Sequence, residues 1–202
     1  LRGLLYEFGV ILPAGRHKAM PQVTQALARL EDTLPAMALE VLREQCASVE
    51  ALSAQIEEIE RKLAAWRKED EAAKRLMQMP GVGLLTATAA VAAVGDAKVF
   101  SSGREFAAFL GLVPRQSGTG GRVKLLGISK RGDGYLRRLL IHGARAVITH
   151  AKARDPWVEA LLARRPLNAV VVALANKMAR TIWALLAHGR HYEPRGQALG
   201  CA

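Results

Sequence analysis

The chain has 202 residues, half of them apolar and only 5% aromatic, and its 29 Lys and Arg outnumber its 18 Asp and Glu to give a formal net charge of +11. The length and the alanine-rich composition predict one or two helical domains with a buried core, and the positive charge favours an acidic polymer as partner. Two cysteines, Cys46 and Cys201, exclude a disulfide framework and a zinc cluster and fit a reducing cytosol.

The first part of the chain, residues 1–79, is predicted to be helical. We expect a short helix that ends near Gly9, an extended segment, and a second helix from Pro21 to about residue 30. Between Pro35 and Pro80 the sequence contains no Gly or Pro, which predicts one long helix. Five apolar residues on this helix alternate at steps of four and three, the period of a coiled-coil seam: Leu52, Ile56, Ile59, Leu63 and Trp66. The coiled coil would bridge domains or join two copies, and a structural spacer is the simpler interpretation.

Pro80 ends this helix, and the sequence Pro-Gly-Val-Gly leads into an alanine-rich helix that extends to about residue 94. The arrangement resembles the hairpin of helix-hairpin-helix modules. There, Gly81 and Gly83 would let backbone N–H groups face a nucleic-acid phosphate without obstruction. A plain connector between helices explains the two glycines equally well. Farther along, Ser101 and Ser102 are candidate N-caps for a short helix.

The segment from residue 114 to 136 is too polar and too rich in glycine to belong to the core. Glycines at 118, 120 and 121 free the backbone, and Ser117 and Thr119 stand between them with little steric cover. Five cationic residues surround the two hydroxyls: Arg115, Arg122, Lys124, Lys130 and Arg131. A hydroxyl on a flexible loop inside a cationic ring fits a nucleophile that attacks a phosphodiester. A solvated loop that only binds phosphate is the alternative.

The residues after this loop predict three more helices. Asp133 is a candidate cap for a helix with one basic face, formed by Arg138, His142 and Arg145, and the pair Asp155-Pro156 begins a short helix. His142 alone is more often a structural histidine than a catalytic one.

The final helix is long and apolar, with Asn168 as its expected cap. On it, Lys177 and Arg180 form a second basic ridge. These residues and Asn176 lie in the middle of the stretch 169–187, so we interpret it as a buried helix of a soluble protein and not as a membrane span. The tail, residues 193–202, is expected to be frayed.

The chain is not expected to hold a metal ion. Carboxylates are scarce in its second half and lie near predicted helix ends, where capping explains them better than a two-metal centre does. The residues concerned are Asp96, Glu105, Asp133, Asp155 and Glu159. No Walker-type phosphate loop and no histidine pair at metal spacing are present.

Several motifs, in their order along the chain, resemble the C-terminal transposase domain of the insertion-sequence 110 family, 1111 subgroup. They are PGVGxxTA at 80–87, GDxxxF at 95–100, FAAFLGLVPRQ at 106–116, GISKRGDxYLR at 127–137, HGARA at 142–146 and ALANKMAR at 173–180. The opening letters LRGLLxEFG are similar to the family's segment just after its N-terminal catalytic domain. The resemblance covers nearly the whole chain.

The resemblance implies a bacterial DNA recombinase of mobile elements that acts in the cytoplasm. Members of this family carry a RuvC-like N-terminal domain whose four acidic residues bind Mg²⁺, a coiled-coil middle region, and a C-terminal domain with a serine that forms a covalent link to a DNA phosphate. A bridge RNA pairs with donor and target DNA and selects both. On this resemblance the acidic domain would lie upstream of Leu1, and the chain alone would be inactive. A decayed copy of such a gene is the alternative.

The family pattern after Pro-Arg-Gln has a variable residue, two hydroxyl residues and two glycines, whereas this chain has Ser-Gly-Thr-Gly-Gly. We favour Ser117 as the nucleophile because a primary alcohol is less hindered, and Thr119, directly before the glycine pair, is the second candidate.

The sequence therefore predicts a mainly α protein with a coiled-coil region at 1–79 and a C-terminal transposase domain at 80–192. Its expected partners are DNA, guide RNA, the upstream RuvC-like domain and a second copy of the chain. A non-catalytic nucleic-acid-binding module and a coiled-coil scaffold are the competing hypotheses.

Overall fold

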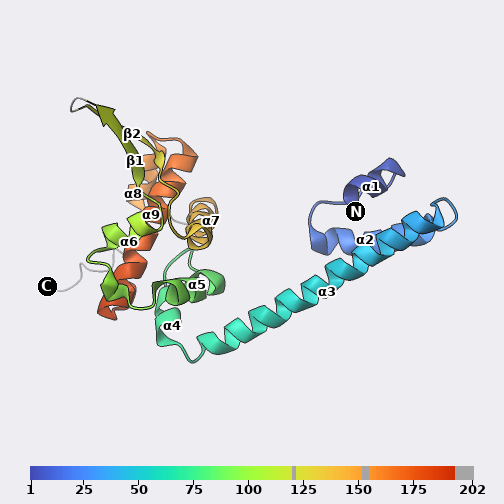
Figure 1. The fold of residues 1–202 in the computed structure, drawn as a ribbon, viewed down its shortest axis with the longest axis horizontal. Coiled ribbons are helices and arrows are strands. Elements are labelled where there is room, and N and C mark those ends of the chain that lie inside the picture. The colour runs from blue at the N-terminus through green and yellow to red at the C-terminus, as the bar shows by residue number, and fades with distance from the viewer. Residues whose placement is uncertain (120–121, 152–154, 194–202) are drawn as a thin grey trace. The chain divides into compact units, whose positions relative to one another are not determined.

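The computed structural model describes residues 1–119, 122–151 and 155–193, without the side chain of Thr119. The described residues form nine α-helices, one short 3-10 helix and two strands, so the predicted mainly α fold is confirmed (Figure 1). The chain divides into two compact units, residues 1–62 and 63–202, and each is described by itself. Apart from residue 193, the tail that we expected to be frayed lies outside the described residues.

Unit 1 contains α1 (Arg2–Glu7), α2 (Arg16–Arg29) and most of α3 (Ala36–Arg67). Its core consists of eight buried residues: Leu5, Leu12, Ala19, Val23, Leu27, Leu34, Leu39 and Leu42. The prediction that the second helix starts at Pro21 is wrong, because α2 begins five residues earlier and buries Ala19. Pro21 is tolerated near the N-terminus of α2, where it removes one backbone hydrogen bond.

The long helix that we predicted up to Pro80 is interrupted. α3 ends at Arg67, and α4 (Glu71–Met77) starts after Asp70, whose carboxylate accepts a hydrogen bond from the backbone N–H of Ala73 at 2.6 Å. An N-cap of this kind ends one helix and starts another without Gly or Pro, which explains the error. The proposed coiled-coil seam is exposed, since Leu52, Ile56 and Ile59 each expose more than half of their surface. The coiled coil itself stays a prediction.

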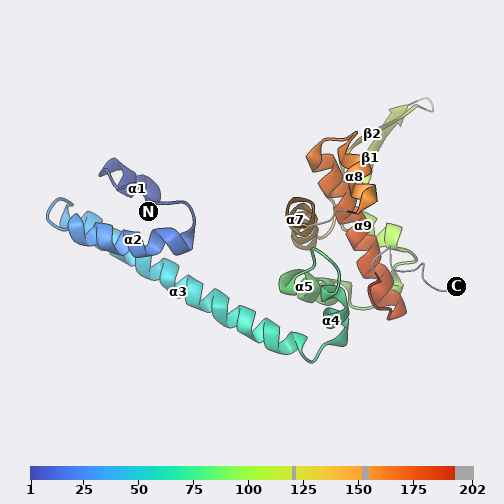
Figure 2. The same ribbon diagram turned by 180° about the vertical axis from the view of Figure 1, so that it is seen from behind.

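Unit 2 is built around α9 (Leu167–His188), which packs against helices on several sides (Figure 2). The other elements are α4, α5 (Leu84–Val94), the 3-10 helix η1 (Ala97–Val99), α6 (Gly103–Phe109), β1 (Pro114–Thr119), β2 (Arg122–Ile128), α7 (Gly134–His150) and α8 (Pro156–Leu162). α4 contributes Ala73 and Leu76 to this core, so the compact region begins before residue 80.

By length and composition, α9 is the one described helix that could cross a membrane. Eight of its residues are nevertheless buried in the packed core of unit 2: Val170, Val171, Leu174, Ala175, Met178, Ala179, Ile182 and Leu185. The prediction of a buried helix over this stretch is confirmed.

Local capping signals predicted several helix starts. Asp133 caps α7, Asp155 caps α8 and Ser102 caps α6 through hydrogen bonds from backbone N–H groups to their side-chain oxygens. Asn168 is a correction, because it lies inside α9 and Pro166 holds the N-cap position. The Asn168 Oδ1 instead accepts a hydrogen bond from Arg145 Nη2 at 2.9 Å.

The glycine-rich segment is not a flexible loop in its first half, and this is the main correction to the predicted fold. Residues 114–119 and 122–128 pair as the antiparallel strands β1 and β2. The Gly-Gly pair at 120–121 lies outside the described residues, but in the sequence it separates two short strands and is a hairpin signal that we missed. Gly118 suits the close pairing, since a Cβ there would lie 2.3 Å from the backbone oxygen of Arg122.

Candidate nucleophile and nucleic-acid interface

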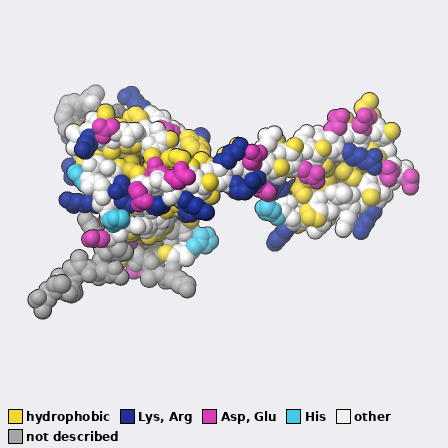
Figure 3. Space-filling view, turned by 90° about the horizontal axis from the view of Figure 1, so that it is seen from below, with side chains coloured by type: hydrophobic (Ala, Val, Ile, Leu, Met, Phe, Trp, Pro, Cys, Tyr) yellow, Lys and Arg dark blue, Asp and Glu magenta, His cyan; other side chains and the backbone are white. Residues whose placement is uncertain are grey.

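The positive charge of the protein resides in unit 2. Residues 63–202 hold 22 Lys and Arg against 9 Asp and Glu, a net charge of +13, whereas residues 1–62 hold 7 against 9, a net charge of −2. On the face drawn in Figure 3, Lys and Arg side chains are spread over the surface of unit 2. Such a surface attracts polyanions from a distance and gives binding that depends on salt.

The hairpin of β1 and β2 carries five of the residues that the sequence singled out: Arg115, Ser117, Thr119, Arg122 and Lys124. Ser117 lies opposite Lys124 in the register, and residues 119 and 122 form the next pair toward the turn. Because paired residues share a face and alternate residues along a strand do too, Ser117, Arg122 and Lys124 share one face of the hairpin. All three are exposed. The Thr119 side chain lies outside the described residues.

Arg115 lies at an irregularity of the ladder. Between the pairs 114–128 and 116–125, one residue of β1 faces two residues of β2, Leu126 and Gly127, which is the arrangement of a β-bulge. Strand alternation therefore does not determine the face that carries Arg115. Its side chain is exposed on the same strand as Ser117, two residues away.

The base of the hairpin, in contrast with its exposed strands, is held by hydrogen bonds to the helical body. The backbone N–H of Ser129 donates to Val113 at 2.8 Å, and that of Lys130 donates to Gly111 at 3.1 Å. Arg137 Nη1 donates to the carbonyl oxygens of both Leu110 and Arg131, at 3.0 and 2.9 Å. One guanidinium on α7 thus joins the segment before β1 to the segment after β2.

Two of the predicted phosphate-binding residues, Lys130 and Arg131, lie in this anchored segment and are exposed. Lys130 adopts a positive φ of 57°, which a lysine rarely takes. Next to them, Gly132 has a φ of +70°, and a Cβ there would lie 1.7 Å from the carbonyl oxygen of Phe109. The backbone of this segment therefore passes directly over the end of α6.

The predicted basic face of α7 is present, and it differs along its length. Arg138 and His142 are exposed, and Arg138 has no hydrogen-bond or ion-pair partner within the described part of the chain. Arg145 is also exposed, but its guanidinium donates to Asn168 on α9. Arg145 consequently has a structural contact as well as the phosphate-binding role that the sequence suggested.

Gly81 and Gly83 differ in what surrounds them. Gly81 has a φ of +81°, and a Cβ there would lie 2.8 Å from the backbone oxygen of Gly143 on α7, so close packing explains this glycine. Gly83 is exposed at the N-cap position of α5, no side chain caps that helix end, and a Cβ at Gly83 would meet nothing within 4 Å. Gly83 therefore fits the predicted phosphate contact at a helix N-terminus, and that role stays a prediction.

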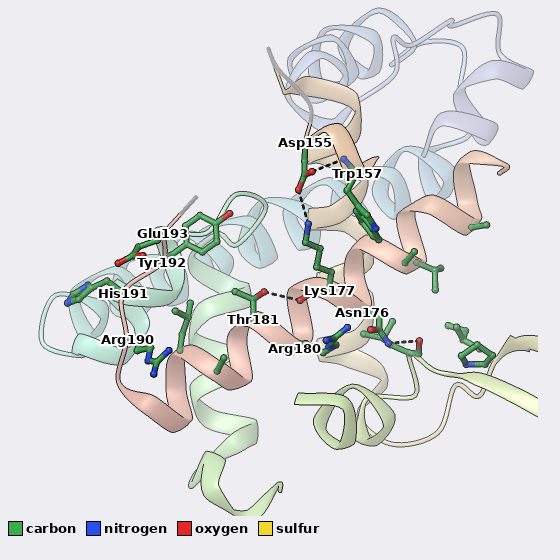
Figure 4. Close-up of a pocket in the computed structure, with 18 residues that line it drawn as sticks. Asp155, Trp157, Asn176, Lys177, Arg180, Thr181, Arg190, His191, Tyr192 and Glu193 are labelled. Carbon is green, nitrogen blue, oxygen red and sulfur yellow. Dashed lines mark hydrogen bonds and ion pairs between the residues drawn. The ribbon is translucent and has the colours of Figure 1, made fainter. Parts of the chain in front are cut away.

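Lys177 and Arg180 lie on α9 along a groove (Figure 4). Lys177 Nζ forms an ion pair with Asp155 Oδ2 at 2.7 Å and lies 4.6 Å from the centroid of the Trp157 ring. The Arg180 side chain is exposed and has no hydrogen bond or ion pair within the described residues, so it is the more available cation.

The described residues contain no group of three or more His, Cys, Asp or Glu side chains that could hold a metal ion. Two carboxyl groups of unit 2 have a lowered pKa for local reasons. Hydrogen bonds from Ser101 lower the pKa of Glu105, and the ammonium of Lys74 lowers the pKa of Glu71. Both carboxylates serve helix ends rather than a catalytic site.

Sequence reasoning missed two residues of this region. Arg137 sits between the predicted cationic residues and was not singled out, because its contacts with positions 110 and 131 depend on the tertiary fold. Trp157 lines the groove along α9, and an exposed tryptophan directly after Asp-Pro in a basic chain was the available signal.

The chain was compared with known proteins. Residues 73–161 match the family described as Transposase IS116/IS110/IS902. A probable family 20 transposase of Pseudomonas aeruginosa is 48% identical over 96% of this chain and 59% of its own length. The transposase for insertion sequence element IS1111A of Coxiella burnetii is 42% identical over 95% of this chain and 54% of its own length. The transposase for insertion sequence element IS1328 of Yersinia enterocolitica is 40% identical over 94% of this chain and 57% of its own length.

The chain thus spans somewhat more than half the length of these curated relatives. The matching region runs from within α4 to within α8 and therefore includes the whole hairpin with its anchored base. The chain is similar over nearly its whole length to these transposases, and part of its unit 2 matches the IS116/IS110/IS902 family.

Proposed function

We propose that this chain supplies the nucleophile of a DNA transposase and much of its nucleic-acid-binding surface, with Ser117 attacking a DNA phosphodiester. The observation that supports this most is the hairpin, where Ser117 lies exposed opposite Lys124 on an arm whose base is held to the helical body. The similarity to transposases makes DNA the expected substrate.

In the proposed step the Ser117 Oγ forms a bond to phosphorus while the bond from phosphorus to one adjoining sugar oxygen breaks. The hydroxyl proton is transferred, in the net reaction, to the released sugar oxygen. The phosphodiester keeps its single negative charge and becomes a phosphoserine diester. Lys124 and Arg122, on the same face as Ser117, would hold the phosphate oxygens and stabilise the charge that develops on them.

The groups around this step follow from the same hypothesis. The exposed cations of the anchored segment and of α7 would hold the DNA backbone on either side: Lys130, Arg131, Arg138 and Arg145. No carboxylate cluster in the described residues fits Mg²⁺, so the ion would be bound by a RuvC-like region upstream. We further propose that a guide RNA selects the DNA and that two copies of the chain pair through the apolar seam on α3.

The test is a search for a covalent protein–DNA adduct that survives denaturation. The full-length transposase, including its upstream region, is incubated with guide RNA, Mg²⁺ and labelled DNA, and adducts are separated on a denaturing gel. Ser117→Ala should abolish the adduct while Thr119→Ala retains it. An adduct that persists in Ser117→Ala and disappears in Thr119→Ala would move the role to Thr119.

A complete absence of adduct in the unmodified enzyme, together with salt-dependent binding of DNA or RNA, would favour the non-catalytic nucleic-acid-binding module. Binding that neutralises several phosphates weakens steeply as salt rises, because counterions are released. Absence of any such binding would favour the scaffold hypothesis.

A further inference from the structure

We propose that the groove along α9 binds a single-stranded nucleic-acid segment, with one base stacked on Trp157 and the backbone held by Arg180 and Arg190. The inference rests on the proposed function in assuming that unit 2 acts on nucleic acid. It adds a second binding site, separate from the serine face of the hairpin, and it specifies that the bound nucleic acid is single-stranded.

The groove has a volume of 1370 Å³ and lies entirely within unit 2. One face of α9 forms its wall from Ala169 to Leu185, a length of about 24 Å at 1.5 Å per residue. The base of the hairpin and Trp157 border one end, and residues 190–193 border the other. A long, open channel of this kind suits a polymer rather than a small molecule, whose pockets are commonly below about 1,000 Å³.

The cationic side chains in the groove differ in whether they already have a partner within the protein. Lys177 is occupied by Asp155, as described above, whereas neither Arg180 nor Arg190 has a side-chain hydrogen bond or an ion pair within the described part of the chain. In Figure 4 both guanidinium groups extend from the wall and the C-terminal segment without a dashed contact. Glu193 is the other carboxylate of the lining. Two uncommitted guanidinium groups along one channel fit successive phosphates.

Trp157, at the hairpin end of the groove, supplies the second proposed interaction, which is stacking with a base. Trp157 lines the groove and exposes 39% of its surface, and its backbone N–H donates to the Asp155 carboxylate at 2.8 Å at the start of α8. Lys177 Nζ lies 4.6 Å from the ring centroid, which helps to hold the indole in place. Stacking on an aromatic side chain requires a base that is free of its duplex neighbours, so this combination favours single strands.

The position of the groove connects it with the proposed nucleophile. Pro114, the first residue of β1, lines the groove, and Ser117 follows three residues later on the same strand, about 10 Å away at 3.3 to 3.4 Å per residue. A strand that leaves the groove at Pro114 is therefore led along the hairpin toward Ser117. This arrangement would present an unpaired segment next to the phosphodiester that is attacked.

The test measures binding of fluorescein-labelled 12-nucleotide probes to the 202-residue chain by fluorescence anisotropy. The probes are oligothymidine, oligouridine and a 12-base-pair DNA duplex. Trp157→Leu should weaken oligothymidine binding by about 5- to 150-fold, the usual contribution of one stacked base, and Trp157→Phe should restore most of it. Arg180→Gln should reduce the slope of log affinity against log salt by about one unit.

Arg29→Gln is the matched control, because this exposed arginine of α2 lies in unit 1 and has no described partner. It should leave both the affinity and the salt slope unchanged. Circular dichroism of every variant verifies the fold. The oligothymidine and oligouridine probes separate the two sources of a single strand, since only RNA carries 2′-hydroxyl groups.

Unchanged oligonucleotide affinity in both Trp157→Leu and Arg180→Gln would overturn the proposal. An equal loss of affinity for the DNA duplex would also overturn it, because binding would then depend on charge alone. If these variants changed the oligomeric mass measured by light scattering but left oligonucleotide binding unchanged, the groove would be assigned to a protein partner and the proposal would be overturned. Probe binding requires no covalent link to DNA, so a failure of the adduct experiment and a failure of the groove are distinguishable.

Discussion

The helical core of unit 2 and the hairpin that projects from it hold their residues in opposite ways. In the body of unit 2, backbone segments approach so closely that single glycines are required, as at Gly132 in the segment before α7, where a Cβ would lie 1.7 Å from the carbonyl oxygen of Phe109. The strands are exposed over nearly their whole length and project beyond the helices in both views (Figures 1 and 2). Val123 and Leu125 expose 66% and 64% of their surfaces.

The two regions therefore have different tasks: the core positions the hairpin, and the exposed strands give a substrate access to Ser117. The core determines where the hairpin starts, through Arg137 and the backbone bonds at its base, while the strands leave the Ser117 hydroxyl open to a large substrate. An isolated two-stranded hairpin is only marginally stable in water, so a bound partner would order it further. Substitutions in the two regions should therefore change different properties of the protein.

The largest effect on stability is expected for Gly132→Ala. The substitution combines a positive φ with a clash against backbone, so it should reduce the free energy of unfolding by about 2 to 5 kcal/mol. Gly127→Ala on β2 is the matched control, since a Cβ there meets nothing within 4 Å, and it should change the free energy by less than about 0.5 kcal/mol. Urea denaturation followed by circular dichroism compares the two. Equal effects would contradict the division between core and arm.

The next largest effect is expected for Arg137→Gln. The variant loses the guanidinium that donates to the carbonyl oxygens of Leu110 and Arg131, which should cost about 1 to 3 kcal/mol and loosen the base of the hairpin. The neighbouring Arg138→Gln removes the same charge from an exposed position and should cost less than about 0.5 kcal/mol. Hydrogen exchange at the amides of Ser129 and Lys130 should speed up only in Arg137→Gln. Unchanged exchange there would remove Arg137 from its positioning role.

The predictable parts of this protein are those that local chemistry decides. Asp133 and Asp155 were expected as caps because a carboxylate before a helix satisfies free N–H groups within three residues. The role of Arg137 and the groove beside Trp157 depend on segments far apart in the sequence, which no local signal reveals. The hairpin was missed for another reason: β1 lacks the alternation of apolar and polar residues that usually predicts a strand, and in β2 only residues 122–125 alternate.

A smaller effect is expected from the capping interaction of α6. Hydrogen bonds from Ser101 lower the pKa of Glu105 in the folded state, so the carboxylate stabilises the fold above its unfolded pKa, and this contribution is lost as pH falls through the folded pKa. Glu105→Gln removes the titration. Its melting temperature should therefore fall less between pH 6 and pH 3 than that of the unmodified chain, as measured by calorimetry. Equal falls in both proteins would exclude a contribution of Glu105.

The smallest effect on stability is expected for Ser117→Ala. The hydroxyl is exposed and makes no hydrogen bond within the described part of the chain, so the free energy of unfolding should change by less than about 0.5 kcal/mol. Urea denaturation provides the measurement. A loss above about 1 kcal/mol would mean that Ser117 has a structural role, and loss of activity in this variant would then no longer indicate a nucleophile.

The most direct test locates the covalent link itself. The adduct that the proposed function expects of the full-length protein is digested with nuclease and trypsin, and the peptides are fragmented in a mass spectrometer. Trypsin cleaves after Arg115 and Arg122, so one peptide, residues 116–122, carries both candidate hydroxyls and no others. The account predicts a nucleotide on Ser117. A nucleotide on Thr119, or an unmodified peptide with the link elsewhere, would contradict it.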